Sequence, residues 1–254
     1  MIDTNLLSLF APAFFACLLI SLVNGPLGAE VVRRGIIFID LAIAHIAGLG
    51  FIAGTVLFPD APFSLLQFIT YLFVLSFASI FWMLERKLPQ RVEAWIGVSF
   101  ILAASMTFLL VDDHPHAGGL IKNLLSGQIL FTTWDDVAKL GLVYGVVIAA
   151  MWLKKAHRHP YGFYVLFTLA ITTCIPIAGV YLIFASLILP GLAAERTSNP
   201  TLAVVLIGIL STVLGVTVGM LLDLPNGPCL VVSYVVVTTL VMLKQLKFKP
   251  ISKV

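Results

Sequence analysis

Residues 36–58 read IIFIDLAIAHIAGLGFIAGTVLF. The run is long enough to cross a bilayer as one helix, because a spanning helix needs about 20 apolar residues. It nevertheless carries two ionisable side chains, Asp40 and His45, within its first third. Ionisable groups inside a bilayer are costly and usually functional. This stretch therefore predicts a membrane helix and, within it, a site.

The rest of the chain has the same apolar character. Of its 254 residues 60% are hydrophobic and 11% are charged, whereas an ordinary soluble domain carries roughly 25% charged residues. This composition excludes a water-soluble enzyme, a nucleic-acid-binding protein and a disordered protein. We expect residues 1–254 to form a single transmembrane domain in a lipid bilayer, with any soluble parts on other chains.

Apolar runs separated by short breaks rich in Pro, Gly and charge predict an all-α fold, a polytopic transmembrane helical bundle of about eight to nine crossings. The run 180–193 is short, and Pro190 near its end favours a broken or tilted helix. Residues 118–131 (GGLIKNLLSGQILF) are too short to cross and predict a re-entrant or interfacial helix. The crossings are expected near residues 5–28, 36–58, 64–84, 94–111, 137–153, 162–178, 180–193, 201–222 and 228–243.

The placement of the few charges predicts the orientation, since cytoplasmic loops carry an excess of Lys and Arg. With the N-terminus outside and the C-terminus in the cytoplasm, every Lys and Arg except Lys122 and Lys139 lies on the inner side. An acidic outer rim concentrates cations and indicates cation traffic. The acids expected on that rim are Asp3, Asp60, Asp112, Asp113, Asp135, Asp136 and Asp223.

A carboxylate and an imidazole form a mixed oxygen and nitrogen ligand set that suits zinc, manganese or iron, so Asp40 and His45 are candidate metal ligands. Their five-residue spacing puts them about 140° apart on a regular helix. They could share one ion only if the helix is distorted, for example by a π-bulge. Alternatively, Asp40 caps or pairs near the inner interface, and His45 hydrogen-bonds a neighbouring helix.

Two further clusters are candidates for binding. The outer cluster could sample a divalent cation or simply form a polar loop; it consists of Asp112, Asp113, His114 and His116. The inner cluster lies among bases and is better suited to phosphate or protein contacts; it consists of Lys154, Lys155, His157, Arg158 and His159. No Walker motif and no nucleophile elbow are present, so an ATPase that drives transport would be another chain.

Five blocks resemble, in order, the integral-membrane permease of the zinc/manganese/iron ABC importers, the metal-ion branch related to the siderophore and vitamin B12 permeases. The similarity covers most of the chain. The blocks are NGPLGAEVVRRG (24–35), FIDLAIAHIAGLG (38–50), LLSGQILFTTWDDV (124–137), IAGVYLIFASLILPGLAAER (177–196) and LLDLPNGPCLVV (221–232).

The resemblance implies a homodimeric permease in a bacterial or archaeal cytoplasmic membrane. An ATP-binding subunit would dock on each inner face, and an extracytoplasmic binding protein would deliver the metal. The metal would be the transported substrate, with no permanently bound cofactor, and the chain itself would not be an enzyme. In such permeases the Asp and His of the second helix line the metal path, which implies this role for Asp40 and His45.

Two departures from the family pattern bear on the mechanism. The family spaces its Asp and His by four residues, and Leu41 occupies the usual Asp position here. The family's coupling helix is reduced to KKAHRHPYG at residues 154–162, although its bases could still contact an ATPase. The open alternatives are a permease of the same fold for a metal chelate or a cobalamin-like molecule, and an ATP-independent channel or scaffold.

Overall fold

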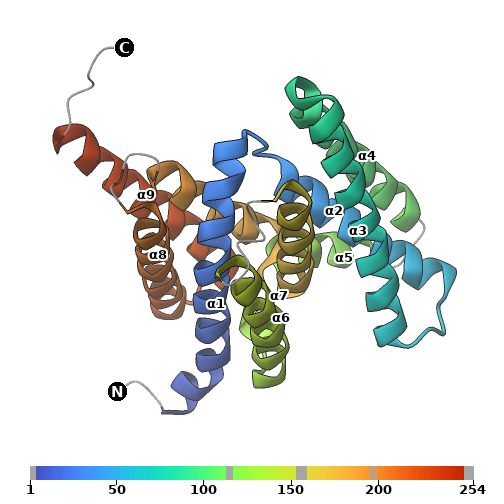
Figure 1. Ribbon diagram of the computed structural model, residues 1–254. Coiled ribbons are helices and arrows are strands. Elements are labelled where there is room, and N and C mark those ends of the chain that lie inside the picture. The colour runs from blue at the N-terminus through green and yellow to red at the C-terminus, as the bar shows by residue number, and fades with distance from the viewer. Residues whose placement is uncertain (1–3, 113–116, 153–158, 195–196, 198, 249–254) are drawn as a thin grey trace.

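The computed structural model describes residues 4–112, 117–152, 159–194, 197 and 199–248. Across these residues the chain forms helices and short turns, without strands, as Figure 1 shows. The all-α bundle predicted from the sequence is thereby confirmed. The helices are α1 (Thr4–Arg34), α2 (Ile39–Leu57), α3 (Phe63–Lys87), α4 (Val92–Val111), α5 (Ala117–Ser126), α6 (Trp134–Trp152), α7 (Pro160–Ala194), α8 (Pro200–Leu222) and α9 (Asn226–Phe248), with 3₁₀ turns η1 (Pro89–Arg91) and η2 (Ile129–Phe131).

Seven of the described helices are long and apolar enough to cross a membrane, namely α1 to α4 and α7 to α9. Helix α6 occupies the crossing predicted at 137–153, but its first two turns carry Asp135, Asp136 and Lys139. Helix α5, followed by η2, occupies the segment predicted at 118–131 as too short to cross. The number of crossings therefore depends on how α6 and α7 are counted.

Helix α7 folds back on itself at Gly179, whose backbone (φ 70°, ψ 162°) is not helical. Before the bend, the Ala170 carbonyl lies 3.5 Å from the Tyr144 hydroxyl, which is 3.4 Å from Asn24 Oδ1. After the bend, Ser186 Oγ accepts a hydrogen bond from Asn24 Nδ2 at 3.0 Å. A continuous helix would separate residues 170 and 186 by about 24 Å, so both can meet Asn24 only if the chain reverses.

The two arms of α7, residues 160–178 and 180–194, correspond to the crossings predicted at 162–178 and 180–193. Their junction packs against the loop that follows α5. Gly127 and Gly179 both have positive φ, and a Cβ on Gly127 would lie 2.5 Å from the Gly179 nitrogen. The Gln128 N–H donates to the Ile177 carbonyl at 3.1 Å. The loop thereby satisfies a carbonyl that the bend frees, as a helix interrupted inside a bilayer requires.

Helix α1 continues to Arg34, beyond the end predicted near residue 28. The stretch Gly25-Pro26-Leu27-Gly28 lies inside the helix. Gly28 instead allows a close helix crossing, because a Cβ there would sit 2.6 Å from the Leu187 carbonyl carbon. Small residues permit such backbone contacts between membrane helices.

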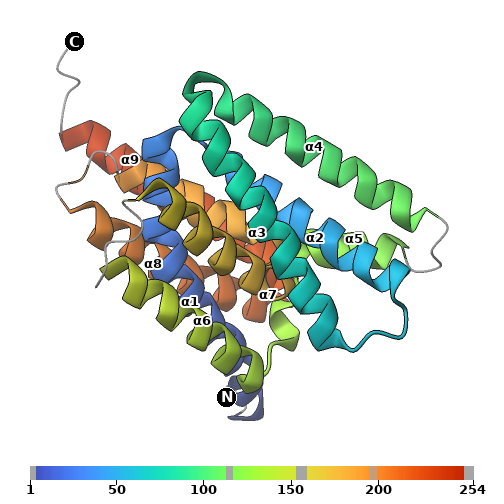
Figure 2. The same cartoon turned by 45° about the vertical axis from the view of Figure 1, so that its right-hand side comes forward.

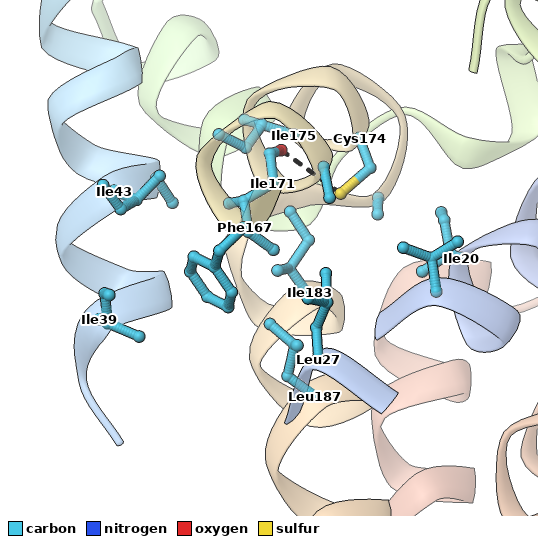
Figure 3. Packing of buried hydrophobic residues seen from close by; sticks show 14 of the residues in the cluster. Ile20, Leu27, Ile39, Ile43, Phe167, Ile171, Cys174, Ile175, Ile183 and Leu187 are labelled. Atoms are coloured by element: carbon cyan, nitrogen blue, oxygen red, sulfur yellow. Dashed lines mark hydrogen bonds between the residues drawn. The ribbon is translucent and has the colours of Figure 1, made fainter. Parts of the chain in front are cut away.

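In both views of the bundle, α1 and α7 lie at the centre, with α2, α3 and α4 on one side and α8 and α9 on the other (Figures 1 and 2). The buried side chains form one continuous cluster around α7. Figure 3 shows Ile39 and Ile43 of α2 facing Phe167 of α7, with Ile20 and Leu27 on the α1 side.

Polar side chains connect the helices inside this apolar cluster. In addition to the Asn24–Ser186 hydrogen bond, Ser21 Oγ lies 2.8 Å from the Tyr234 hydroxyl. The Tyr71 hydroxyl lies 2.9 Å from Thr173 Oγ1. Such contacts join α1 to α9 and α3 to α7, and interhelical hydrogen bonds of this kind help to specify helix pairing in lipid.

The substitution Gly28→Ala is expected to destabilise the bundle, because its methyl group would meet the backbone of Leu187 and overpacking typically costs about 1–3 kcal/mol. The matched control is Gly145→Ala, since a Cβ at Gly145 has nothing within 4 Å. The thermal unfolding midpoint of the purified protein in detergent should fall for Gly28→Ala and stay level or rise for Gly145→Ala. Equal midpoints for the two variants would contradict the close crossing.

Candidate metal path

The turn between α1 and α2 positions the candidate site. Gly35 has φ 68°, and its N–H donates to the Val32 carbonyl at 3.1 Å, while the Ile36 N–H donates to the Val31 carbonyl at 3.3 Å. This pair of bonds around a left-handed glycine is the Schellman end of a helix. It turns the chain sharply, so α2 begins at Ile39 beside the end of α1.

Asp40 lies in the first turn of α2 and is 1% exposed. Among the described residues, neither of its carboxylate oxygens has a hydrogen-bond partner. The N-terminal end of a helix carries the equivalent of about half a positive charge, which favours a carboxylate at this position. This partial positive charge alone does not neutralise a full negative charge on Asp40.

His45 lies further along α2 and is partly buried. Its Nδ1 lies 2.9 Å from the Leu41 carbonyl oxygen, and a carbonyl can only accept, so Nδ1 carries the hydrogen. Its ring meets Phe100 of α4 edge to face, with 4.7 Å between centroids. This arrangement leaves the Nε2 lone pair for a ligand, and metal-binding histidines are commonly oriented by a hydrogen bond at the other ring nitrogen.

Helix α2 is a regular α-helix from Ile39 to Leu57, so the bulge that a shared ion would require is absent from it. Five residues separate Asp40 and His45 by about 7.5 Å along the axis and about 140° around it. The structure therefore does not bring the two side chains together into one site. Their role along a metal path stays a prediction.

Leu41, at the position where the family pattern has Asp, lines an apolar groove of about 640 Å³ between α2, α7 and α9. Tyr181, Leu189 and Val232 contribute to its walls. A second cavity, of about 310 Å³, lies between α2, α3, α5 and α7. Its polar lining consists of Gln67, Thr70, Tyr71, Asn123, Gln128 and Thr172.

An ion cluster joins the ends of α1 and α3 beside the start of α2. Arg34 donates to Glu30 at 2.7 Å and to Glu85 at 3.1 Å, and Arg33 also pairs with Glu30, at 2.6 Å. The Arg34 guanidinium lies 4.4 Å from the centroid of the Phe163 ring at the start of α7. The ends of α1 and α3 and the start of α7, all assigned to the inner side by the sequence, thus lie together.

Glu93, in the first turn of α4, is a residue that the sequence analysis did not single out. Its Oε1 accepts the Phe38 N–H at 3.1 Å and so caps α2 from a neighbouring helix. Its other oxygen, Oε2, is buried and has no partner among the described residues. In the sequence Glu93 directly precedes the crossing predicted at 94–111, where it resembles an ordinary loop charge.

The remaining predicted residues are described only in part. Asp112 is exposed at the end of α4. His159 is exposed, and its carbonyl accepts the Phe163 N–H at 2.9 Å. The other members of the two clusters, Asp113, His114, His116, Lys154, Lys155, His157 and Arg158, lie outside the described residues.

The fold and site define a polytopic helical membrane protein that holds titratable groups inside its bundle. The model of the ABC 3 transport family matches residues 7–158 and 155–245. The chain therefore belongs to the ABC 3 transport family.

The chain is 28% identical over 251 residues to the "High-affinity zinc uptake system membrane protein ZnuB" of Buchnera aphidicola subsp. Schizaphis graminum, covering 88% of this chain and 93% of that protein. It is 26% identical over 258 residues to a Chlamydia muridarum protein named "Probable metal transport system membrane protein", covering 89% and 87%. Its fold resembles the structure "PsaBC from Streptococcus pneumoniae in complex with Fab", with a TM-score of 0.74, 20% identity and coverage of 94% and 95%.

Replacing Arg34 by Met is expected to lower the free energy of unfolding by about 3 kcal/mol, because it leaves the part-buried Glu85 without its ion-pair partner and removes one of the two partners of Glu30. Arg33→Met is the matched control: the Arg33 side chain is 68% exposed and that of Arg34 is 10% exposed. An exposed pair contributes about 1 kcal/mol at most. Equilibrium unfolding in detergent micelles measures both variants. Similar losses in the two would show that the burial of Arg34 has no energetic consequence.

Proposed function

We propose that the chain is the membrane-spanning permease subunit of an ABC-type importer that moves a divalent transition metal, zinc, manganese or iron, across the cytoplasmic membrane. The observation that carries this proposal is His45, a half-buried imidazole in a membrane helix with its Nδ1 hydrogen-bonded and its Nε2 available. Membership of the ABC 3 transport family and the zinc-uptake and metal-transport names of its relatives support it.

The permease would work with an ATP-binding subunit on the inner face and an extracytoplasmic metal-binding protein on the outer face. A second copy of the chain would complete a homodimer. Hydrolysis of ATP would occur on the partner, so this chain would contribute a path rather than catalysis. The excess of Lys and Arg in the predicted inner loops supports an N-terminus outside and a C-terminus in the cytoplasm.

The substitutions Asp40→Ala and His45→Ala should each abolish metal uptake, because each removes a candidate ligand from the path. Uptake of zinc and manganese would be measured in a strain that lacks its other importers, with membrane expression of every variant verified. Gly145→Ala serves as the control that should transport normally. Wild-type uptake by both ligand variants would overturn their assignment to the path.

Docking of the ATPase can be tested at the shortened inner loop. Simultaneous charge reversal of Lys154, Lys155 and Arg158 to Glu should weaken association with the ATP-binding subunit at least tenfold, since these bases are the candidate contacts. Co-purification measures the association, and reversal of Lys122 and Lys139, predicted on the outer side, is the control. Unchanged co-purification in the loop variant would place the contact elsewhere.

The apolar groove favours one alternative, a permease for a metal chelate. Leu41 lines that groove where the family pattern has Asp, and an organic chelate would suit apolar walls better than a bare ion would. Vesicles reconstituted with the ATPase and the binding protein separate the two substrates. Uptake of free Zn²⁺ or Mn²⁺ that an excess of chelated metal does not inhibit supports the ion, whereas uptake of the chelate alone supports the alternative.

A further inference from the structure

We propose that Asp40 and Glu93 together form a binding site for a divalent cation where the first turn of α2 meets the first turn of α4. The inference rests on the proposed function, because the cation would be the transported ion. It adds Glu93 to the path and separates this all-oxygen site from His45.

The geometry brings the two carboxylates to the same place from different helices. Glu93 Oε1 accepts the N–H of Phe38, the residue that precedes α2 and stands two positions before Asp40. The carboxyl groups of Asp40 and Glu93 lie within electrostatic reach of each other. Further along the same two helices, His45 meets Phe100, so both titratable side chains of α2 lie along its contact with α4.

Three carboxylate oxygens in this place are buried and have no partner among the described residues. They are both oxygens of Asp40 and Oε2 of Glu93. A buried polar group without a hydrogen bond is costly, and a buried charge without a partner is costlier still. Carboxylate oxygens with unused lone pairs are therefore brought together from two helices.

The charge balance points to a divalent ion. In the neighbouring ion cluster, the positive charges of Arg33 and Arg34 are matched by those of Glu30 and Glu85. The N-terminus of α2 contributes the equivalent of about +0.5 to the pair formed by Asp40 and Glu93. With both carboxyl groups ionised, a deficit of about 1.5 charges remains, which a divalent cation would neutralise. Carboxylate oxygens favour a hard ion such as Mn²⁺ over ions that prefer sulfur or nitrogen.

The test uses the purified full-length chain in detergent and Mn²⁺ alone as the probe, with free Mn²⁺ measured by electron paramagnetic resonance. Glu93→Gln keeps an oxygen that can accept the Phe38 N–H but removes the charge. We expect Glu93→Gln and Asp40→Asn each to weaken Mn²⁺ binding at least tenfold. Asp135→Asn, which removes an exposed carboxylate, should bind Mn²⁺ like the wild type.

Thermal unfolding distinguishes a cation site from a structural cap. Mn²⁺ should raise the unfolding midpoint of the wild type, because a ligand that binds only the folded state stabilises it, and should leave that of Glu93→Gln unchanged. Without metal, Glu93→Gln should be at least as stable as the wild type, since a buried repulsion is removed. A variant that is less stable without metal but gains the wild-type increment from Mn²⁺ would overturn the site in favour of a cap.

The outcomes also separate this site from the proposed function. Wild-type protein that binds no Mn²⁺ overturns the cation site, since protonation would then neutralise the pair. Normal metal uptake by the Asp40 and His45 variants contradicts the proposed path, whatever the binding experiment gives.

Discussion

The bundle depends on the need to satisfy backbone polar groups inside a bilayer at the point where α7 reverses. The bend at Gly179 interrupts the helix and frees carbonyls that lipid cannot solvate. The loop after α5 approaches closely enough for the Gln128 N–H to donate to one of these carbonyls, that of Ile177. This approach is possible only because Gly127 and Gly179 carry no side chains where they meet. The two arms of α7 can then pack around α1 at the centre, and the remaining helices surround this core.

A second constraint is electrostatic and concentrates where α1 ends and α2, α4 and α7 begin. Arg34 joins Glu30 to Glu85 and stacks on Phe163, so that part of the cluster is balanced. Asp40 and Glu93 lie beside it without such partners among the described residues. Buried carboxylates in this region are therefore stabilised in two ways. Arg34 pairs with Glu30 and Glu85 within the protein, and in our proposal a transported cation binds Asp40 and Glu93.

The sequence predicted most of the helices because long apolar runs in a membrane protein have few other interpretations. The short arm 180–193 and the non-crossing segment 118–131 were also recognisable from their lengths. The continuation of α1 past residue 28 was not, and the close contact of Gly28 with Leu187 could not be foreseen because the two residues lie far apart in the sequence. Asp40 and His45 stood out as charges within an apolar run, whereas Glu93 did not, because its importance arises from a partner far away in the sequence.

The hydrogen bonds of α1 have a consequence for biosynthesis. Asn24 bonds to Ser186 and Ser21 contacts Tyr234, so the first helix to leave the ribosome finds its polar partners near the end of the chain. At about 5–20 residues per second of synthesis, Ser186 emerges about 8–32 s after Asn24. During that interval the Asn24 side chain lacks its partner on α7, whereas Ser21 can donate to the Cys17 carbonyl of its own helix. The insertion machinery, or neighbouring helices in transient pairings, must hold it until α7 and α9 arrive.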